Sequence, residues 1–226
     1  MSTFFERYFP NVVAISDEFV EATIQTLYMT FWTALIAGIL GIILGIVLVV
    51  TRPGGILESR GLFELLDKII NIVRSIPFII LLALLGTTTR LIVGTTIGET
   101  AALVPLIAGI IPFFARQIEI ALLEVDPGVI EAAEAMGTSP LGIIVRVYLP
   151  EGLAGIIRVS ALTIINVIGL TAMAGAVGAG GLGNLAITRG YNRFQNDVTI
   201  MATLIILILV FFSQFVSSLL VKKVSH

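Results

Sequence analysis

The sequence contains no cysteine, and its one histidine is the last residue, His226. Disulfides and thiolate metal sites therefore cannot form within this chain. A histidine metal centre or a Ser–His catalytic pair would have only the terminal imidazole to use. We expect no metal site and no catalytic residue.

Charged residues are also scarce, at 12% of the 226 residues. Soluble domains have about a quarter. Hydrophobic residues make up 57%, and the mean hydropathy is +1.08. These values predict an integral membrane protein. The net charge of −2, with no basic cluster that carries interleaved aromatics, gives no indication of a nucleic-acid partner.

Long apolar runs predict an all-α protein with five transmembrane helices in a single domain over residues 1–226. The clearest run, from Ala22 to Thr51, has no charged residue and exceeds the roughly 20 residues that cross about 30 Å of hydrocarbon. Acidic residues precede it, so we interpret it as a retained span and not as a signal peptide. We expect spans at about 20–51, 69–87, 100–118, 152–177 and 198–221.

The sequence also predicts several local features in and around these spans. Residues 1–17 suit a short interfacial helix or a disordered tail. Pro77 predicts a kink near the start of the second span, and residues 86–99 suit an exposed turn. Gly41-x3-Gly45 predicts close helix packing, either within the bundle or against another subunit.

The segment 119–150 is a polar island between spans. Asp126 can cap a helix that starts at Pro127, and Gly137 can end it in the left-handed conformation. Ser139 and Pro140 then start a second helix. A helix of about ten residues needs a packing partner. Helical spacing places one set of residues on one side (Val129, Ala132, Ala133 and Met136) and Glu131 and Glu134 on an adjoining edge.

The spacing Glu131-Ala132-Ala133, Gly137, Val147 and Leu149-Pro150 resembles the EAA loop of ABC importer permeases, EAA-x3-G-x9-I-x-LP. Only Val147 departs from that pattern. The resemblance implies a cytoplasmic loop over about 119–150 that docks into a groove of an ATP-hydrolysing subunit. The implied coupling residues are Glu131, Ala132, Ala133, Glu134, Met136 and Gly137. From the caps alone, the loop could equally be an amphipathic connector between spans.

Two further stretches indicate which importer permeases the chain resembles most specifically. Arg74–Phe78 is similar to amino-acid importer permeases, and Thr171–Gly183 resembles permeases of bacterial methionine importers, a type I ABC importer family. Gly178-x-Gly180-x-x-Gly183 also matches a dinucleotide-binding pattern, but no strand precedes it, and we reject that interpretation. The resemblance covers essentially the whole chain, and it implies the type I permease fold.

The resemblance also implies the partners. They are a second copy of the chain, two ATPase subunits and an extracytoplasmic methionine-binding protein. This chain has no Gly-x4-Gly-Lys-Ser/Thr loop, so ATP and Mg would be bound by the ATPase, and the permease itself would be neither an enzyme nor a cofactor protein. It would translocate methionine, in L- and D-forms, by alternating access. Another amino acid or a small peptide is the alternative substrate.

A stripe on the fourth span is our candidate for the translocation path. It consists of residues that recur at intervals of three and four: Thr163, Asn166, Leu170 and Met173. Polar groups within a span tend to face a cavity or the interior of the bundle. The alternative is that Thr163 and Asn166 only hydrogen-bond to neighbouring helices.

The distribution of lysine and arginine predicts the orientation. With the EAA loop in the cytoplasm, nine of the 13 basic residues lie inside and four outside, as the positive-inside rule requires. The nine are Arg52, Arg60, Lys68, Arg74, Arg116, Arg146, Arg158, Lys222 and Lys223; the four are Arg7, Arg90, Arg189 and Arg193. We expect the N-terminus outside the bacterial cytoplasmic membrane and the C-terminus in the cytoplasm.

Two other classes of protein fit less well. An ion-coupled secondary transporter would be expected to carry mid-membrane carboxylates or an internal repeat. An intramembrane enzyme would need a motif such as His-Glu-x2-His or Gly-x-Ser-x-Gly, and neither occurs in the sequence.

Overall fold

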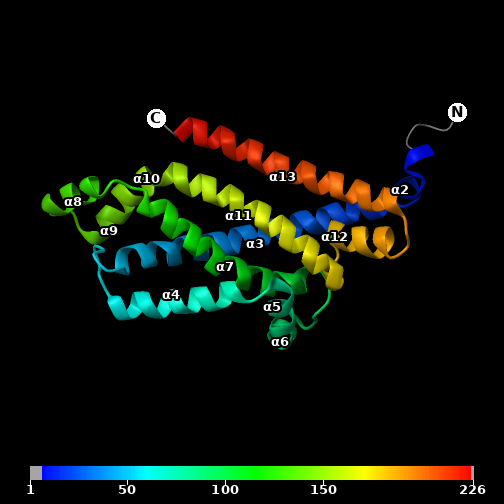
Figure 1. The fold of residues 1–226 in the computed structure, drawn as a ribbon, viewed down its shortest axis with the longest axis horizontal. Helices are drawn as coiled ribbons and strands as arrows, with labels where there is room; N and C mark the ends of the chain where they lie inside the picture. The colour runs from blue at the N-terminus through cyan, green and yellow to red at the C-terminus, as the bar shows by residue number, and fades with distance from the viewer. Residues whose placement is uncertain (1–6, 225–226) are drawn as a thin grey trace. The chain divides into compact units, whose positions relative to one another are not determined.

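The structure, a computed structural model, describes residues 7–224, and within them it contains helices and no strand. Figure 1 shows the elements in chain order. The first half contains α2 (Pro10–Ala14), α3 (Ser16–Thr51), α4 (Arg60–Ser75), α5 (Phe78–Leu84), α6 (Gly86–Val93) and α7 (Glu99–Leu123). The second half contains α8 (Pro127–Ala135), α9 (Pro140–Ile143), α10 (Leu149–Glu151), α11 (Leu153–Ala174), α12 (Gly181–Leu185) and α13 (Asn196–Val224). Three π-helical segments join some of them: η1 (Ile144–Tyr148), η2 (Gly175–Ala179) and η3 (Ala186–Tyr191).

Among residues 7–224, four helical stretches are long and apolar enough to cross a membrane: Ser16–Thr51, Glu99–Leu123, Leu153–Ala179 and Asn196–Val224. They correspond to four of the five predicted spans, with ends that extend up to five residues beyond the predicted ones. Within residues 1–17, where we expect either a short interfacial helix or a disordered tail, the described part contains the short helix α2. Residues 1–6 of that expectation, and His226, lie outside the described residues.

The remaining predicted span, 69–87, is not one continuous helix. It covers the end of α4, all of α5 and the start of α6. Ile76 is extended, with φ −80° and ψ 121°, because the ring of Pro77 disfavours the α-conformation of the residue before it. Pro77 itself lacks the N–H that would continue the α4 ladder. The kink predicted at Pro77 is therefore a complete break, and it separates α4 from α5.

The expected turn over residues 86–99 is also shorter than predicted. Residues Gly86–Val93 form α6, whose apolar end (Leu91, Ile92 and Val93) suits a helix, and only the segment after it is irregular. Gly94 closes α6 in the left-handed conformation, with φ +85°.

The chain divides into two compact units. Unit 1 comprises the described chain up to Leu35, Pro77–Ile107 and Ile164–Ser213, and unit 2 comprises Ile36–Ile76, Ala108–Thr163 and the chain from Gln214. Unit 1 contains two apolar clusters. In the first, Phe19 and Ala22 pack with Leu182, Leu185 and Val198. In the second, Met29 packs with Ala102, Leu106, Ala174 and Ala179.

Polar contacts also tie the segments of unit 1 together. The Gln25 Oε1 atom accepts the N–H of Gly181 at 2.7 Å, and Thr26 Oγ1 accepts that of Leu182 at 2.9 Å. These two side chains of α3 thereby satisfy the first backbone donors of α12, which would otherwise lack partners. Arg189 binds both carboxylate oxygens of Glu18, at 3.1 and 2.6 Å.

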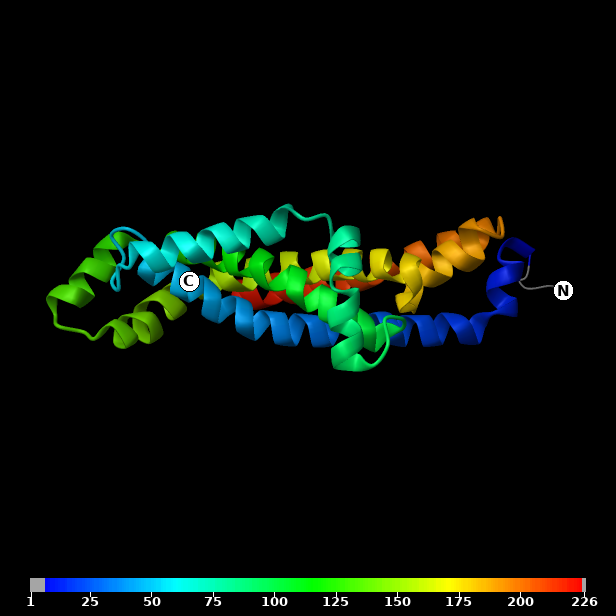
Figure 2. The same ribbon diagram turned by 90° about the horizontal axis from the view of Figure 1, so that it is seen from below.

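Unit 2 is packed around Leu48 of α3, Ile70 of α4 and Ala115 of α7. A Cβ added to Gly45 would lie 2.7 Å from the Cβ of Ile118, so α3 and α7 approach more closely here than larger residues permit. The Gly41-x3-Gly45 motif therefore serves packing within the bundle. Figure 2 shows α8 and α9 as a helical hairpin that follows α7 in this unit.

Candidate functional site

The α8–α9 hairpin has the caps that the sequence predicts. The Asp126 carboxylate accepts the N–H of Gly128 at 2.8 Å, and the Ser139 hydroxyl accepts that of Gly142 at 3.2 Å. Gly137 has φ +75°, and the N–H of Thr138 binds the carbonyl of Ala133 at 3.1 Å. These bonds close the helix with a left-handed residue, as predicted. The hairpin is thus fixed by its own local sequence.

The predicted apolar side of α8 is divided in the structure. Ala133 is buried at 4% exposure, whereas Val129 and Met136 are 43% and 78% exposed. Ala132 is also exposed. Ala133 is four residues after Val129 and three before Met136, so helical spacing places it on the same side, but it lies on the edge of that side that packs against the rest of the chain and is buried. The outward stripe is Val129, Ala132 and Met136. Glu131 and Glu134 are both exposed.

A cavity of about 170 Å³ lies beneath α8 within unit 2. Its lining includes Arg52, Ile130, Glu131, Glu134 and Tyr148. Burial raises the pKa of Tyr148 above its ordinary value; the nearby charge of Arg52 opposes this rise in pKa, and that of Glu134 adds to it. Tyr148 therefore stays a neutral phenol beside a guanidinium and two carboxylates.

The return from the hairpin passes through η1 and reaches Leu149-Pro150 in α10. Proline cannot donate to the carbonyl four residues earlier, and its ring clashes with that carbonyl in a regular α-helix. The wider π-turns at Ile144–Tyr148 move this carbonyl away. The Leu-Pro pair of the motif thus sets the local shape of the chain at the start of the next span.

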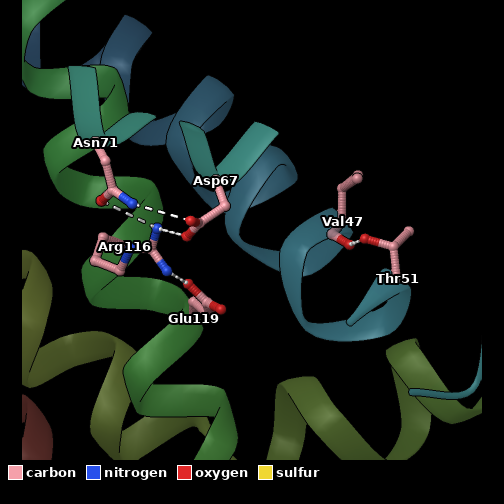
Figure 3. Close-up of polar contacts among 6 residues, drawn as sticks. All are labelled: Val47, Thr51, Asp67, Asn71, Arg116 and Glu119. Atoms are coloured by element: carbon pink, nitrogen blue, oxygen red, sulfur yellow. Dashed lines mark hydrogen bonds and ion pairs between the residues drawn. The ribbon is translucent and has the colours of Figure 1, made fainter. Parts of the chain in front are cut away.

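A polar cluster in unit 2 joins α4 to α7, as Figure 3 shows. Arg116 donates to Glu119 at 2.6 Å, and its other terminal nitrogen binds Asp67. Asn71 donates to Asp67 at 3.0 Å. The side chains of Arg116 and Glu119 are only 16% and 6% exposed. Figure 3 also shows Thr51, whose hydroxyl donates to the Val47 carbonyl at 2.7 Å.

Sequence reasoning missed this cluster. Asp67 and Asn71 are four residues apart, and Arg116 and Glu119 three apart, so each pair shares a helix face. These spacings could have predicted a polar face on each of the two helices. The pairing of the two faces across 49 residues could not be deduced from them.

The four predicted path residues have different environments. The Thr163 hydroxyl donates to the Val159 carbonyl at 2.7 Å and is buried, so a simple intrahelical bond satisfies it. Asn166 is half-buried. Leu170 packs beside the cluster of Met29 and Ala102, and Met173 is 44% exposed. Of the four, Met173 is the most accessible side chain.

Unit 1 also contains a cavity of about 320 Å³ that the sequence did not predict. Its lining comes from the end of α5, from α6 and α7, and from the end of α11 with η2; it includes Thr89, Ala101, Pro105, Ala174 and Val177. No charged residue lines it. Within residues 7–224 no group of three or more His, Cys, Asp or Glu side chains is placed to hold a metal ion.

A family model described as "Binding-protein-dependent transport system inner membrane component" matches residues 37–226. The chain belongs to this family. Its members are transport components of a membrane, and this permease is accordingly a multi-pass transport subunit and not an enzyme. The family confirms the importer class over the secondary transporter and the intramembrane enzyme.

Individual relatives match this permease over almost its full length. It is 46% identical over 213 residues to the "Probable D-methionine transport system permease protein MetI" of Vibrio cholerae, covering 93% of this chain and 94% of that protein. It is 47% identical over 216 residues to the "Methionine import system permease protein MetP" of Bacillus subtilis, covering 96% of each.

A solved structure agrees with these relatives. One described as an inward-facing conformation of the MetNI methionine ABC transporter matches with a TM-score of 0.88 and 40% identity, covering 100% of both chains. This match confirms the all-α permease fold that the sequence predicts.

Proposed function

We propose that this chain is the permease subunit of an ATP-driven importer that carries methionine across the bacterial cytoplasmic membrane. The observation that carries the proposal is the 47% identity, over 96% of each chain, to the methionine import permease of Bacillus subtilis. The Vibrio cholerae relative is named for D-methionine, and we therefore include both stereoisomers. Another amino acid or a small peptide remains the alternative substrate.

In this proposal the permease is a conduit within a larger assembly. Two copies of the chain form the pathway, and two ATPase subunits bind ATP and Mg. An extracytoplasmic binding protein delivers the substrate. The N-terminus lies outside and the C-terminus in the cytoplasm, an orientation that the excess of basic residues in the segments assigned to the inside supports.

The coupling function belongs to α8. The outward stripe that contains Ala132 and Met136 offers an apolar surface for the ATPase, with Glu131 and Glu134 beside it. Ala133 packs inward and lets α8 lie close to the bundle, and Gly137 ends the helix. Closure of the ATPase dimer would carry the two α8 helices together, and the attached spans would switch the pathway from inward-open to outward-open.

The pathway function is assigned to α11, where Met173 is exposed and Asn166 half-buried. Leu170 supports this face from the core. Thr163 is the weaker candidate for a residue that lines the pathway, because its hydroxyl already donates a hydrogen bond within its own helix.

The decisive experiment is uptake of labelled methionine into proteoliposomes that contain this chain, its ATPase and the matching binding protein. We expect uptake that requires ATP and that excess unlabelled L- or D-methionine inhibits. Uptake of a different amino acid under the same conditions would contradict the methionine assignment and keep the importer class. Failure of the ATPase to copurify with the permease would contradict the coupling assignment.

A further inference from the structure

The cavity of about 320 Å³ in unit 1 has a size that suits a small ligand. Small-molecule sites in proteins measure about 300–1,000 Å³, so this one accommodates only a compact molecule. Three of its lining residues, Ala102, Ala174 and Ala179, also belong to the apolar cluster against which Leu170 packs. The cavity therefore adjoins the residues of α11 that we assign to the pathway.

The wall of the cavity includes a buried hydroxyl without a partner. Thr89 lines the cavity and is 4% exposed, and its Oγ1 atom has no hydrogen-bond partner among the described residues. Other helical threonines of this chain, such as Thr26 and Thr163, donate to the carbonyl four residues earlier. A buried hydroxyl that makes no hydrogen bond is costly. The Thr89 hydroxyl is therefore suited to a partner that a ligand supplies.

Two backbone carbonyls at the cavity also lack the donor that a regular helix would supply. Pro105 has no N–H to donate to the carbonyl of Ala101, four residues before it in α7. Val177 departs from helical geometry, with φ −113° and ψ 22°. The N–H groups of Gly181 and Leu182, which a continued helix would offer to the Val177 carbonyl, bind side chains of α3 instead. Ala101, Pro105 and Val177 all line the cavity.

These groups favour one kind of ligand. The two carbonyls and the Thr89 hydroxyl can accept hydrogen bonds, and an ammonium group supplies three donors and no acceptor. Broken helices in transporters use such free carbonyls to coordinate cations. The cavity opens to the surface at Thr96 and Ile97, which line it and are exposed. An amino acid whose ammonium group lies inside can therefore keep its carboxylate at this opening, where it compensates the positive charge.

We propose that this cavity is a substrate site of the permease itself, and that it takes amino acids with an uncharged, apolar side chain. The carbonyls of Ala101 and Val177 and the hydroxyl of Thr89 bind the ammonium group, and the apolar walls receive the side chain. A charged side chain is excluded, because no charged residue of the described chain lines the cavity to pair with it. The inference rests on the proposed function, because it assumes that the chain transports an amino acid.

The test is photo-crosslinking of the purified permease–ATPase assembly without the binding protein, so that no other chain selects the substrate. The probe is a methionine analogue with a diazirine in its side chain. We expect label in residues 82–105 or 174–179 that excess methionine removes. Norleucine should compete as well as methionine, and glutamate should not compete. Label confined to other segments, label that methionine does not displace, or equal competition by glutamate would overturn the inference.

The role of the ammonium group has its own competitor. N-acetylmethionine keeps the side chain and the carboxylate but has no ammonium group. It should compete about tenfold or more weakly than methionine, because hydrogen bonds to charged groups are the stronger ones. Equal competition would contradict the assignment of the carbonyls of Ala101 and Val177.

Thr89→Val removes the hydroxyl and keeps the shape of the side chain. The methionine concentration for half-maximal competition should rise about twofold to tenfold. The thermal midpoint should not fall, because the hydroxyl has no partner within the described chain. Thr88→Val is the matched control, since Thr88 is exposed on the same helix and does not line the cavity. Equal effects of the two substitutions on competition would overturn the role of Thr89.

A second pair of variants blocks the cavity from its exposed side. Ala83 lines the cavity and is exposed, so Ala83→Phe should fold and should abolish the displaceable label. Leu84→Phe is the control, since Leu84 is 63% exposed and does not line the cavity. ATP-dependent methionine uptake by wild type without displaceable label in the cavity would overturn this inference alone. Absence of that uptake would instead contradict the proposed function.

Discussion

Gly137 holds a backbone conformation that other residues avoid. Its φ is +75°, and no atom lies within 4 Å of the position that a Cβ would occupy. The restriction is therefore conformational and not a matter of space. In a left-handed residue a side chain costs about 1–2 kcal/mol, and a β-branched side chain is the least tolerated. Asparagine tolerates this region better.

From this we predict that Gly137→Val weakens docking of the ATPase by roughly fivefold to thirtyfold, because the end of α8 must rearrange. Gly137→Asn should have a smaller effect. The measurement is the amount of ATPase that copurifies with the permease, together with methionine uptake. Gly61→Val is the matched control, since Gly61 has open space and an ordinary φ. Equal losses at the two positions would contradict the argument.

The raised pKa of Tyr148 predicts how the stability of the folded protein changes with pH. Burial raises its pKa in the folded protein, whereas the unfolded chain releases the proton near pH 10. Stability should therefore be independent of this group below about pH 10 and should fall as the pH rises above it. Thermal midpoints in detergent between about pH 9 and 11 test this expectation.

Tyr148→Phe should remove the fall in stability at high pH, because phenylalanine has no proton to release. Tyr191→Phe is the control, since Tyr191 is 72% exposed and should leave the fall unchanged. An identical decline in both variants would assign the effect to other groups.

At the scale of elements, α12 depends on a close approach to α11. A Cβ on Gly183 would lie 2.2 Å from the carbonyl oxygen of Ala172, and the backbone must shift to accept it. We expect Gly183→Ala to destabilise the protein by about 3 kcal/mol, which lowers the thermal midpoint by roughly 6–12 °C.

Gly169→Ala provides the comparison on α11 itself. No atom lies within 4 Å of the Cβ position at Gly169, and alanine favours a helix by about 1 kcal/mol over glycine. The thermal midpoint should stay the same or rise slightly. A similar decrease in both variants would show that the contact with Ala172 is not the cause.

The elements that could be predicted from the sequence are those determined by local chemistry. Long apolar runs identified four long helices, and Asp126, Ser139 and Gly137 identified the hairpin, because caps act within a few residues. The run over 69–87 was predicted as one helix with a kink at Pro77, and hydropathy could not show that Pro77 would hold Ile76 extended and divide the run into separate helices. The cluster of Asp67 and Arg116 was missed, because hydrophobic periodicity gives no information about which polar faces meet.

For the whole molecule the main prediction is its orientation in the membrane. The excess of basic residues in the segments assigned to the inside predicts that the α8 loop lies in the cytoplasm. The chain has no cysteine, so a single introduced cysteine reports on one position alone. In intact cells, a membrane-impermeant maleimide should label Asn192→Cys.

The same reagent should label Glu124→Cys only after the membrane is permeabilised. Both positions are exposed in the structure, so burial within the chain does not explain a difference between them. The reverse pattern would place α8 outside, where no ATPase could reach it, and would contradict the coupling proposal.

The caps of α12 have a consequence for the synthesis of the protein. Their acceptors, Gln25 and Thr26, precede the donors by 156 residues. The ribosome therefore makes the acceptors first, and α3 is already available when the backbone of α12 emerges. Backbone donors without acceptors are costly in lipid. Because of this order, the donors of α12 have partners as soon as they are synthesised. A circular permutant that places α3 last would leave these donors without partners until α3 is made.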